Sequence, residues 1–340
     1  MIQSALARIL EGHDLARAEA RSVMDEIMRG EASPVQIAGF LIALRLKGET
    51  TDEIAGSAEA MREHVLPVRP RRDDLVDTAG TGGDGAGTFN ISTAAALVAA
   101  AAGAGVAKHG NRAVSSSSGS ADVLEALGFE LELPPKRIAR SIDELGFGFL
   151  FAPTHHPAMR HAAPVRRELA TRTVFNVLGP LTNPAGARAQ VVGVYAPELV
   201  PTIAQVLARL GARRAFVVHG ADGIDELSPA GPNLVCEVVG GRVRKREIDP
   251  VDLGVPRCEP AELRGGSPDE NAITIRRIFE GADGGGRNAV LLNAAGAIAA
   301  SGRARNLREG LGFAREAIDS GVARERLDEL IAFTRAEVTA

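Results

Sequence analysis

A glycine-rich loop followed by a long stretch without acidic residues is the first feature of this sequence that could do chemistry. The run Gly80-Thr81-Gly82-Gly83-Asp84-Gly85 spaces its glycines so that successive backbone N–H groups can converge on an anion. No acidic residue occurs from Gly85 to Ala121, whereas Lys108 and Arg112 both lie within that stretch. Backbone N–H groups and cations both stabilise negative charge, so the pattern favours a site for a phosphorylated molecule.

The same run also matches G-x-G-x-x-G, the pattern of dinucleotide-binding loops, so a nicotinamide enzyme must be considered. That fold requires a helix that begins within the motif and an acidic residue about 20 positions later to hold the ribose. Here no helix can begin before Ser92 or Thr93, and the acidic residue is lacking. A nucleotide P-loop pattern does not occur either. We therefore expect the loop to hold phosphate without a dinucleotide.

Hydroxyl side chains near this loop would add hydrogen-bond donors. Ser92 and Thr93 stand where a helix can begin, and the positive end of that helix would face the same anion. The serine run Ser115–Ser118 and then Ser120 follow Lys108. Each feature alone fits a flexible or solvated loop. Together, on two strand-to-helix loops of one sheet, they favour a polyphosphate site.

An adjacent pair of carboxylates, Asp225 and Glu226, forms a second candidate site. The pair lies on a glycine-rich loop after an apolar run that ends at His219, at the carboxyl end of an expected strand. Magnesium typically binds through one or two carboxylates together with substrate phosphates. A solvated acidic turn is the alternative interpretation, and a phosphate site on the same face favours the metal.

Zinc and disulfide chemistry are not expected. His155, His156 and His161 lack the i, i+4 spacing of a helical zinc site, so we interpret them as loop and wall residues, with His156 facing substrate. The only two cysteines, Cys236 and Cys258, are too few for a disulfide framework and fit a reducing compartment.

Composition excludes several classes of protein. The chain has 340 residues, 45% of them hydrophobic, which is enough for two domains or for one α/β domain with a smaller satellite. No stretch approaches the roughly 18 apolar residues of a membrane-spanning helix, and no export signal is indicated. The net charge of −4 argues against binding along a nucleic-acid backbone. We expect a cytoplasmic enzyme that binds neither membrane nor nucleic acid.

The amino-terminal stretch to about Pro70 predicts helices only. Three segments carry apolar residues at helical spacing and have identifiable ends: 14–30, 33–48 and 50–64. Ser33 with Gln36, and Thr50 with Glu53, match the capping box. The middle segment has an apolar band wider than one core-facing stripe needs, made of Val35, Ile37, Phe40, Leu41, Leu44 and Leu46. This band predicts either a helix-to-helix subunit contact or burial within the domain.

From Leu75 onward, short apolar runs alternate with glycine-rich turns and amphipathic segments, which is typical of a mostly parallel sheet flanked by helices. The expected strands are Leu75–Asp77, Gly105–Ala107, Val191–Tyr195, Ala215–His219, Leu234–Val239 and Val290–Asn293. The expected helices are Thr93–Ala102, Ala121–Leu127, Leu199–Leu210 and Leu307–Asp319. We therefore predict an α/β chain with a small all-helical domain over 1–70, joined by about 164–184. A larger α/β domain would comprise 71–163 and 185–340.

Several ordered motifs together resemble the anthranilate phosphoribosyltransferase family, over nearly the whole chain. They are Asp77–Asp84, Asn90–Thr93, Lys108–Arg112, Gly119–Asp122, Phe175–Pro184 and the pair Asp225-Glu226, with Gly30–Pro34 and Ala43–Thr50 in the helical part. The resemblance implies a nucleoside phosphorylase/phosphoribosyltransferase-like fold that dimerises through its helical domain. It also implies transfer of 5-phosphoribosyl from phosphoribosyl diphosphate to anthranilate, with release of diphosphate, in tryptophan biosynthesis.

Site residues follow from the resemblance, position by position. Phosphoribosyl diphosphate would be held by Gly80, Gly82, Gly83, Asp84, Thr88, Asn90, Ser92, Thr93, Lys108 and Ser120. Magnesium, two ions per subunit, would be bound by Ser92, Asp225 and Glu226. Anthranilate would be met by Gly80, Asn111 and Arg166, with His109, Ala152, Pro153, His156, Met159 and Pro180 along its route. No strong general base is assigned, because the aromatic amine is already nucleophilic.

Two departures from the family pattern and two rival functions stay open at this point. Ser117 stands where a lysine is usual and would weaken one phosphate contact, and Ala170 replaces a usual glycine near Arg166. A nucleoside phosphorylase of the same fold is one rival, although the first glycine loop and Asn90–Thr93 argue against it. A non-catalytic nucleic-acid-binding relative is the other, although it would be expected to lose Asp225 and Glu226.

Overall fold

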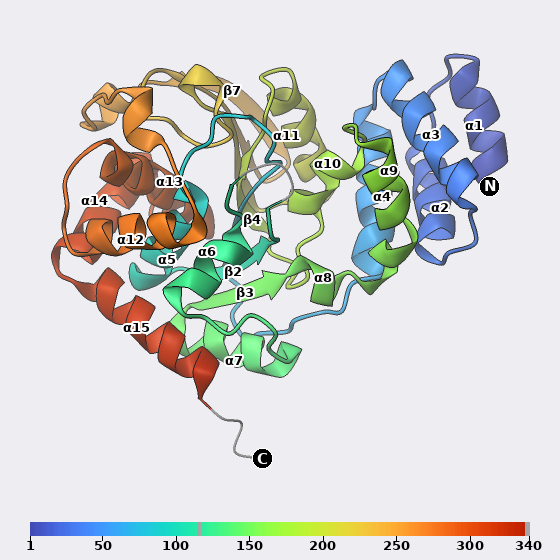
Figure 1. The fold of residues 1–340 in the computed structure, drawn as a ribbon. Helices are drawn as coiled ribbons and strands as arrows, with labels where there is room; N and C mark the ends of the chain where they lie inside the picture. Colours follow the sequence, from blue (N-terminus) through green and yellow to red (C-terminus); the bar gives the residue numbers. More distant parts are fainter. Residues whose placement is uncertain (114–116, 337–340) are drawn as a thin grey trace.

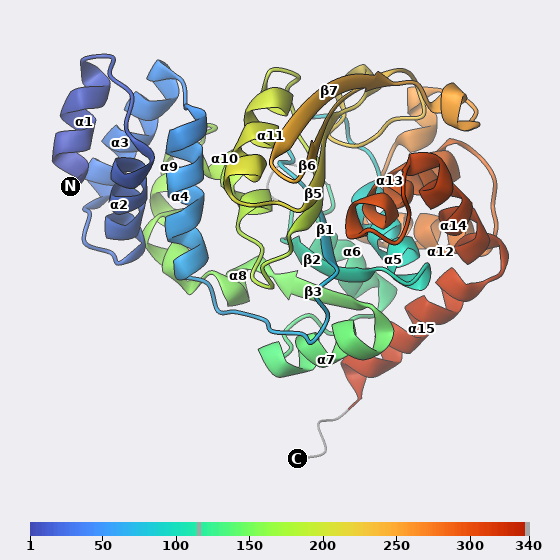
Figure 2. The ribbon, with the colours of Figure 1, turned by 180° about the vertical axis from the view of Figure 1, so that it is seen from behind.

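The chain folds into a small helical part beside a larger part built on one sheet (Figure 1). This computed structural model describes residues 1–113 and 117–336, so Ser115 and Ser116 of the serine run lie outside the described residues. Seen from behind, the helical part stands at one side of the larger part, and one buried apolar cluster includes residues of both (Figure 2). The expected fold class, a small all-helical part with a larger α/β part, is confirmed, and the boundary near residue 70 stays a prediction.

Four helices form the amino-terminal part, one more than the sequence analysis predicted: α1 (Ile2–Leu10), α2 (Arg17–Met28), α3 (Pro34–Lys47) and α4 (Thr51–Glu63). Both predicted capping boxes are present, on Ser33 with Gln36 and on Thr50 with Glu53. In α3 the central apolar residues are buried, whereas Val35 and Leu46 are each 82% exposed. Burial within the domain therefore accounts for the middle of the apolar band but not for its two ends.

A middle segment of the chain returns to the helical part. It comprises α8 (Ala152–His155), α9 (Ala163–Leu169) and α10 (Phe175–Leu178), with 3₁₀ turns at Pro157–His161 and Gly179–Leu181. Helix α9 packs on α3, and α10 packs on α4. Val165, Phe175 and Leu178 share one buried cluster with residues of α2, α3 and α4.

Seven strands form one sheet in the order β3-β2-β1-β4-β5-β6-β7. Their bounds are β1 (Leu75–Gly80), β2 (Gly105–Gly110), β3 (Phe147–Phe151), β4 (Ala189–Gly193), β5 (Arg214–His219), β6 (Asn233–Val239) and β7 (Arg242–Ile248). The first five strands in this order are parallel to one another. Strand β6 is antiparallel to β5, and β7 is antiparallel to β6. The prediction of a mostly parallel sheet is confirmed. Strand β7 is an outer edge, and its side chains from Arg242 to Glu247 are exposed.

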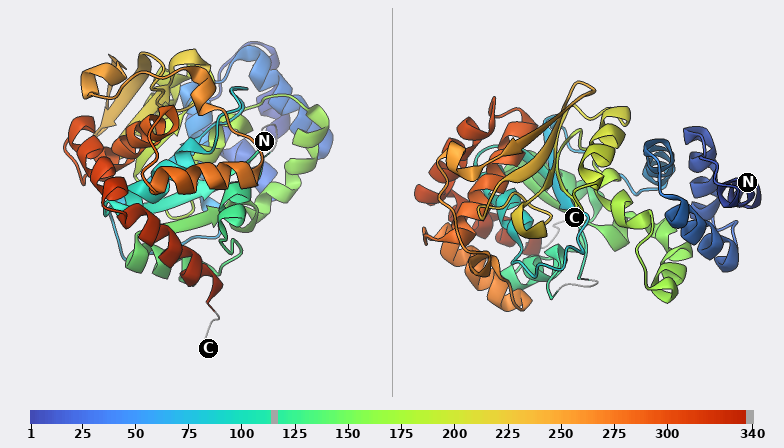
Figure 3. Two further views of the ribbon diagram at one scale, coloured as in Figure 1. Left: turned by 60° about the vertical axis from the view of Figure 1, so that its left-hand side comes forward. Right: turned by 90° about the horizontal axis from the view of Figure 1, so that it is seen from above.

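Helices cover both faces of the sheet (Figure 3). One face carries α5 (Ile91–Ala101) and α13 (Gly285–Ser301), with α6 (Ser120–Leu127), α12 (Pro268–Phe279), α14 (Leu307–Asp319) and α15 (Val322–Arg335) outside them. The other face carries α7 (Pro135–Leu145) against β2 and β3, and α11 (Leu199–Arg209) against β5 and β6. Short 3₁₀ turns occur at Ala221–Gly223, Pro250–Leu253 and Pro260–Leu263.

One predicted strand is wrong: Val290–Asn293 lies inside helix α13. The run is apolar because the helix is buried nearly all round, between the sheet and α14. A short apolar run of that kind has the composition of a buried strand, and only the length of the surrounding segment separates the two. Strands β3 and β7 and helices α1, α7, α12 and α15 were not predicted. No helix within the described ranges is long and apolar enough to cross a membrane.

Candidate active site

The candidate site lies where the carboxyl ends of β1, β4 and β5 meet. The chain runs from β1 outward to β2 and β3 and then starts again on the other side of β1 with β4, so the strand order reverses between β1 and β4. Open parallel sheets bind their ligands at such a reversal. A small cavity occupies this position, lined by Thr78, Ala79, Gly80, Ser92, Val191, Gly193, Val218, Asp225, Glu226 and Asn293.

The glycine loop after β1 is held over this cavity by two hydrogen bonds. Thr81 N donates to Gly193 O at 2.9 Å, and Gly82 N donates to Asp225 Oδ2 at 2.7 Å. Gly82 and Gly83 have φ of 63° and 76°, the left-handed backbone that other residues rarely adopt. The predicted glycines are therefore required by the turn itself, and the turn reaches the predicted metal pair.

Three carboxylates gather at the cavity. One oxygen each of Asp84, Asp225 and Glu226 can be chosen so that all three lie within 4.8 Å of one another. Among the described residues this is the one group of three or more His, Cys, Asp or Glu side chains that could hold a metal, so the histidines form no such group. Asp84, which the sequence analysis placed with the phosphorylated substrate, thus joins the predicted metal pair.

Burial and mutual repulsion disfavour charge on these groups. Burial first, and then the charge of Asp84, raise the pKa of Asp225 to about 6. Burial and the charge of Asp225 raise the pKa of Glu226 well above its ordinary value. Glu226 Oε2 is buried and has no hydrogen-bond partner in the described part of the chain. An orphaned carboxylate oxygen beside two further carboxylates matches what a hard divalent cation requires.

Lys108 is a buried cation whose amino group contacts two residues of the cavity wall. The residue is 2% exposed, and its Nζ donates to Thr78 O at 2.5 Å and lies 3.5 Å from Ser92 Oγ. Burial lowers the pKa of Lys108 to about 8, against the opposing charges of Asp77, Glu226 and Asp225. The prediction that Lys108 and Ser92 belong to one site agrees with this contact.

The sheet opens at Lys108, and two buried side chains fill the gap. The β1–β2 ladder stops after Val76 and Val106. Beyond it, Asp77 Oδ1 accepts from His109 N at 3.1 Å, and Asn183 Nδ2 donates to Asp77 Oδ2 at 2.7 Å and to Ala107 O at 2.8 Å. These contacts hold the backbone on both sides of Lys108, a function that sequence reasoning did not assign to Asp77 or Asn183.

The remaining residues predicted for the phosphorylated substrate lie on the neighbouring loops. Asn90 Nδ2 donates to Ser118 O, and Asn90 Oδ1 accepts from Ser118 Oγ. The same oxygen accepts from Asn271 Nδ2 of α12 at 2.9 Å. Thr93 is fully buried, and Ser120 Oγ donates to Asn111 O at 3.3 Å. Thr88 forms an isolated β-bridge with Arg264. Ser117, the first departure, is exposed.

Arg112 is already paired. Its guanidinium binds Asp122 at 3.1 Å and Glu125 at 2.7 Å, both on helix α6, and these partners raise its pKa. The arginine expected to neutralise phosphate charge is thus neutralised by carboxylates here.

Two predicted wall residues, His109 and His156, form one hydrogen-bonded pair. His109 Nδ1 lies 3.1 Å from Gly179 O, which can only accept, so that nitrogen carries the proton. His109 Nε2 then accepts from His156 Nε2 at 3.1 Å. Burial lowers the pKa of His109 to about 3 and that of His156 to about 4. Both rings are therefore neutral near pH 7.

The other wall residues are joined to this pair through the backbone. His156 N donates to Ala152 O, and Met159 N donates to His156 O. Pro180 O accepts from Gln190 Nε2 at 2.6 Å, which fixes the turn that carries Gly179. Pro153 is exposed. The predicted wall thus comes together around the two histidines.

Arg166 and Arg167, neighbours on α9, have different surroundings. The Arg166 guanidinium lies 5.1 Å from the centre of the Phe175 ring, and burial lowers its pKa. No carboxylate in the described ranges pairs with it. Arg167 is exposed. An arginine held partly out of water without a counter-ion is suited to an anionic ligand.

Arg172 was missed by sequence reasoning. It comes from the segment after α9, donates to Gly83 O and stacks on the Tyr195 ring at 3.9 Å. It therefore ties the returning segment to the glycine loop. Ala170, the second departure, ends α9 with φ of 45°, in the left-handed region that favours glycine.

Fold and site together define a two-domain glycosyl transferase. The model of a glycosyl transferase family's helical bundle domain matches residues 3–65, and that of the same family's a/b domain matches residues 72–324. Anthranilate phosphoribosyltransferase from Anaeromyxobacter sp. (strain K) is 57% identical over 334 residues, covering 98% of this chain and 99% of the relative. The enzyme of the same name from Pelotomaculum thermopropionicum is 54% identical over 98% of this chain and 97% of the relative.

Solved structures agree with these relatives. The anthranilate phosphoribosyltransferase of Thermus thermophilus superposes with a TM-score of 0.93 at 52% identity, over 98% of this chain and 99% of that one. The Saccharomyces cerevisiae enzyme, solved with PRPP and Mg, gives 0.89 at 29% identity, over 98% of this chain and 97% of that one. The chain belongs to the anthranilate phosphoribosyltransferase family.

Proposed function

We propose that this chain transfers the 5-phosphoribosyl group from phosphoribosyl diphosphate to anthranilate, giving N-(5-phosphoribosyl)anthranilate and diphosphate, in tryptophan biosynthesis. The observation that carries the proposal is the carboxylate cluster of Asp84, Asp225 and Glu226 under the glycine loop, with Glu226 Oε2 left without a partner among the described residues. Such a cluster suits a substrate that arrives with magnesium on its phosphates. Family membership and the yeast complex with PRPP and Mg support the same substrate.

The difficult step is cleavage of the bond between the ribose anomeric carbon and diphosphate. Positive charge grows on the sugar and negative charge on the leaving group. Magnesium, for which we propose two ions held by Ser92, Asp84, Asp225 and Glu226, would supply positive charge to that leaving group. Lys108 would add a second, fixed positive charge from β2, and the N–H group of Gly83 would face the phosphates, while that of Gly82 holds Asp225.

Anthranilate would bind on the side of the returning segment. Arg166 would pair with its carboxylate, and Asn111 and Gly80 would face the amine side. The neutral pair His109 and His156 would form a wall that does not compete for the carboxylate. The amine then attacks the anomeric carbon, a C–N bond replaces the C–O bond, and the nitrogen releases a proton. No side chain is assigned as a strong base, because proton loss can follow the attack.

We further propose that the chain works as a homodimer through its helical part. Val35 and Leu46 on α3 and Leu10 on α1 are large apolar residues that are 72% or more exposed. Exposed large apolar side chains at the ends of α1 and α3 leave apolar surface that a protein contact would cover. We assign residues 1–70 and about 164–184 to that part, because α9 and α10 pack on it. Location in the cytoplasm stays a prediction.

Turnover with phosphoribosyl diphosphate and anthranilate tests the function directly. The fluorescence of anthranilate should fall in the presence of magnesium and stay constant when magnesium is chelated. Arsenolysis or phosphorolysis of pyrimidine nucleosides, assayed in parallel, tests the phosphorylase alternative. Binding to single- and double-stranded oligonucleotides at physiological salt tests the non-catalytic alternative. Phosphorolysis or oligonucleotide binding without anthranilate consumption would overturn the proposal.

A further inference from the structure

The loop that carries Asp225 and Glu226 keeps its place although three carboxylates repel one another there. Its backbone is held by a side chain from a distant helix. Asn293 of α13 accepts from Leu227 N through Oδ1 at 3.0 Å and donates to Leu227 O through Nδ2 at 2.8 Å. Leu227 directly follows Glu226, so the amide fixes the peptide next to the metal pair.

We infer that Asn293 is a positioning residue for the magnesium site, because it sets where Asp225 and Glu226 lie before the metal binds. The inference rests on the proposed function, since it takes these carboxylates as magnesium ligands. Asn293 lines the same cavity as both of them. It is not itself proposed as a ligand, because its oxygen and both of its N–H bonds are already used.

The contact resembles the backbone pairing between two strands of a sheet. A peptide neighbour in a sheet exchanges one N–H and one C=O with its partner, and the Asn293 amide does the same with Leu227. Its second N–H donates to Ala289 O of its own helix at 2.9 Å. The amide orientation follows from these partners, because a flipped amide would set donor against donor at Leu227 N and acceptor against acceptor at both carbonyls.

The loop on either side of Leu227 is equally constrained. Asn233 makes the same reciprocal exchange with Ser228, at 2.7 and 3.0 Å. A Cβ on Gly193 would lie 1.4 Å from Asp225 O, and one on Gly220 would lie 2.3 Å from Glu226 O. The backbone of the acidic pair is therefore packed against two glycines and held by an amide at Leu227.

Helix α13 connects this loop to the other predicted magnesium ligand. Among the elements of the larger part, α13 packs closely against α5, and Ser92 lies in the first turn of α5. Both helices are rich in buried alanine and pack against each other, and close packing of this kind restricts relative movement. Asn293 thus sets the acidic pair against the same helix pair that sets Ser92.

A purely structural role explains the position less well. Asn293 is 4% exposed in a helix whose other buried residues are apolar except for Ser301 at its end. A buried amide there costs solvation that only its hydrogen bonds recover, and an apolar residue of similar size fills the same space without that cost. Groups that orient a metal's ligands typically change affinity by about 10- to 100-fold when they are removed.

The test compares Asn293→Leu with Leu292→Ala. Leu292 is the neighbour on α13 and is 2% exposed, so its truncation lowers stability while it keeps the two Asn293 hydrogen bonds to Leu227. We expect Asn293→Leu to need about tenfold more magnesium for half-maximal turnover, with turnover recovering at saturating magnesium. We expect Leu292→Ala to lower the melting temperature and leave the magnesium requirement unchanged.

A second readout does not depend on turnover. With phosphoribosyl diphosphate present and anthranilate absent, the melting temperature is measured against magnesium concentration. Its midpoint should move by the same factor in Asn293→Leu and stay fixed in Leu292→Ala. If Asn293→Leu does not fold, Asn293→Ser replaces it, because serine is too short to bridge both backbone groups of Leu227. Equal magnesium midpoints in the unmodified protein and a folded Asn293 variant would overturn the inference. Absence of turnover in the unmodified protein would instead overturn the proposed function.

Discussion

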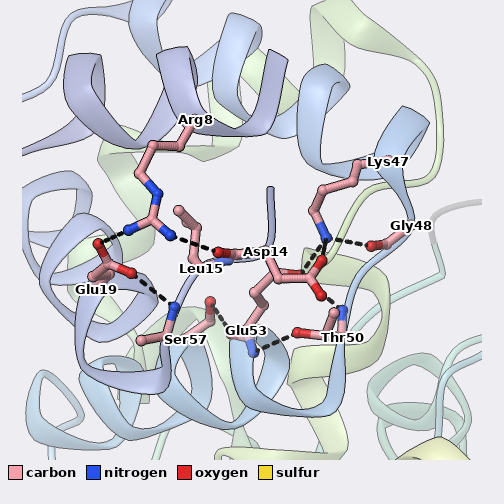
Figure 4. A network of polar contacts seen from close by, with 10 residues as sticks. Arg8, Asp14, Leu15, Glu19, Lys47, Gly48, Thr50, Glu53 and Ser57 are labelled. Carbon is pink, nitrogen blue, oxygen red and sulfur yellow. Dashed lines mark hydrogen bonds and ion pairs between the residues drawn. The ribbon is translucent and has the colours of Figure 1, made fainter. Parts of the chain in front are cut away.

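Two glutamates held away from water show opposite solutions to the same problem. In the helical part, Glu53 is 0% exposed and its oxygens accept from Leu15 N at 2.9 Å, Lys47 Nζ at 3.0 Å and Thr50 N at 2.8 Å (Figure 4). Glu226, at the carboxyl edge of the sheet, has one oxygen without any donor among the described residues, and its nearest charges include two carboxylates.

The difference separates a structural carboxylate from a functional one. Burying a charge during folding is costly unless hydrogen-bond donors and a cation compensate it, and Glu53 has both within its own domain. The cluster at Glu226 sets three carboxylates near one buried cation, Lys108, so a divalent cation from outside the chain would balance the excess negative charge. The Glu53 network therefore stabilises the fold, and the Glu226 cluster favours binding of a cation.

The largest expected effect comes from neutralising the acidic pair. Asp225→Asn with Glu226→Gln removes the charge and keeps the shape. Turnover should fall on the order of 1,000-fold, about 4 kcal/mol of transition-state stabilisation. The melting temperature without magnesium should not fall, because two repelling charges are gone. Asp222→Asn, an exposed acid three residues earlier, is the control and should keep full turnover. Near-normal turnover in the double variant would place the metal elsewhere.

The next effect concerns Glu53 and should be one of stability alone. Glu53→Ala leaves the N–H groups of Leu15 and Thr50 without their acceptor and removes one of the two carboxylates that pair with Lys47, so the free energy of unfolding should fall by about 3 kcal/mol. Urea denaturation measures this loss. Glu59→Ala removes a partly exposed ion pair with Arg17 and should cost less than about 1 kcal/mol. Turnover per folded molecule should be unchanged in both variants. A loss of turnover in folded Glu53→Ala would contradict a purely structural role for Glu53.

Arg166, which has no carboxylate partner among the described residues, extends the comparison to the recognition of anthranilate. Arg166→Ala should weaken apparent anthranilate recognition by about 2 to 3 kcal/mol, since a partly buried carboxylate would lose its charged partner. Arg167→Ala, the exposed neighbour, should cost much less. Steady-state kinetics with anthranilate varied separates the two. Equal and small effects would remove Arg166 from the site.

The smallest effect is a dependence of stability on pH. The pKa of Asp225 is raised from 3.8 to about 6, so the metal-free native state binds more protons than the unfolded chain between these values. Its stability should therefore fall as pH rises through that window. Saturating magnesium should oppose the fall, because the metal requires the charged form. Thermal melts from about pH 4 to 7, compared with those of the double variant, isolate the contribution. The same slope in both proteins would exclude the acidic pair as its source.

Sequence reasoning was strongest where a function depends on local spacing. The caps at Ser33 and Thr50, the turn at Gly82 and Gly83, and the pairing of an acidic loop with a strand end were all readable from neighbours in the chain. Val290–Asn293 was misread because a buried helix and a buried strand share one apolar composition.

Contacts between distant segments could not be predicted in the same way. Asp77 meets Asn183, Asn293 meets Leu227, and Arg172 meets Gly83 only because the topology brings separate elements together. Asp84 shows the same limit, since its chain neighbours relate it to the glycine loop and only the fold places it beside Asp225. No spacing rule contains that information.

The outer strand β7 has a consequence for how the protein behaves at high concentration. It leaves one row of backbone N–H and C=O groups open at the border of the sheet, which is a template on which another chain can build cross-β structure. Its exposed side chains include Arg242, Arg244 and Lys245. A second copy approaching in register would bring like charges together and would have to strip them of water. We therefore expect the basic border to disfavour edge-to-edge stacking, and neutral residues at these three positions should make concentrated solutions turbid sooner.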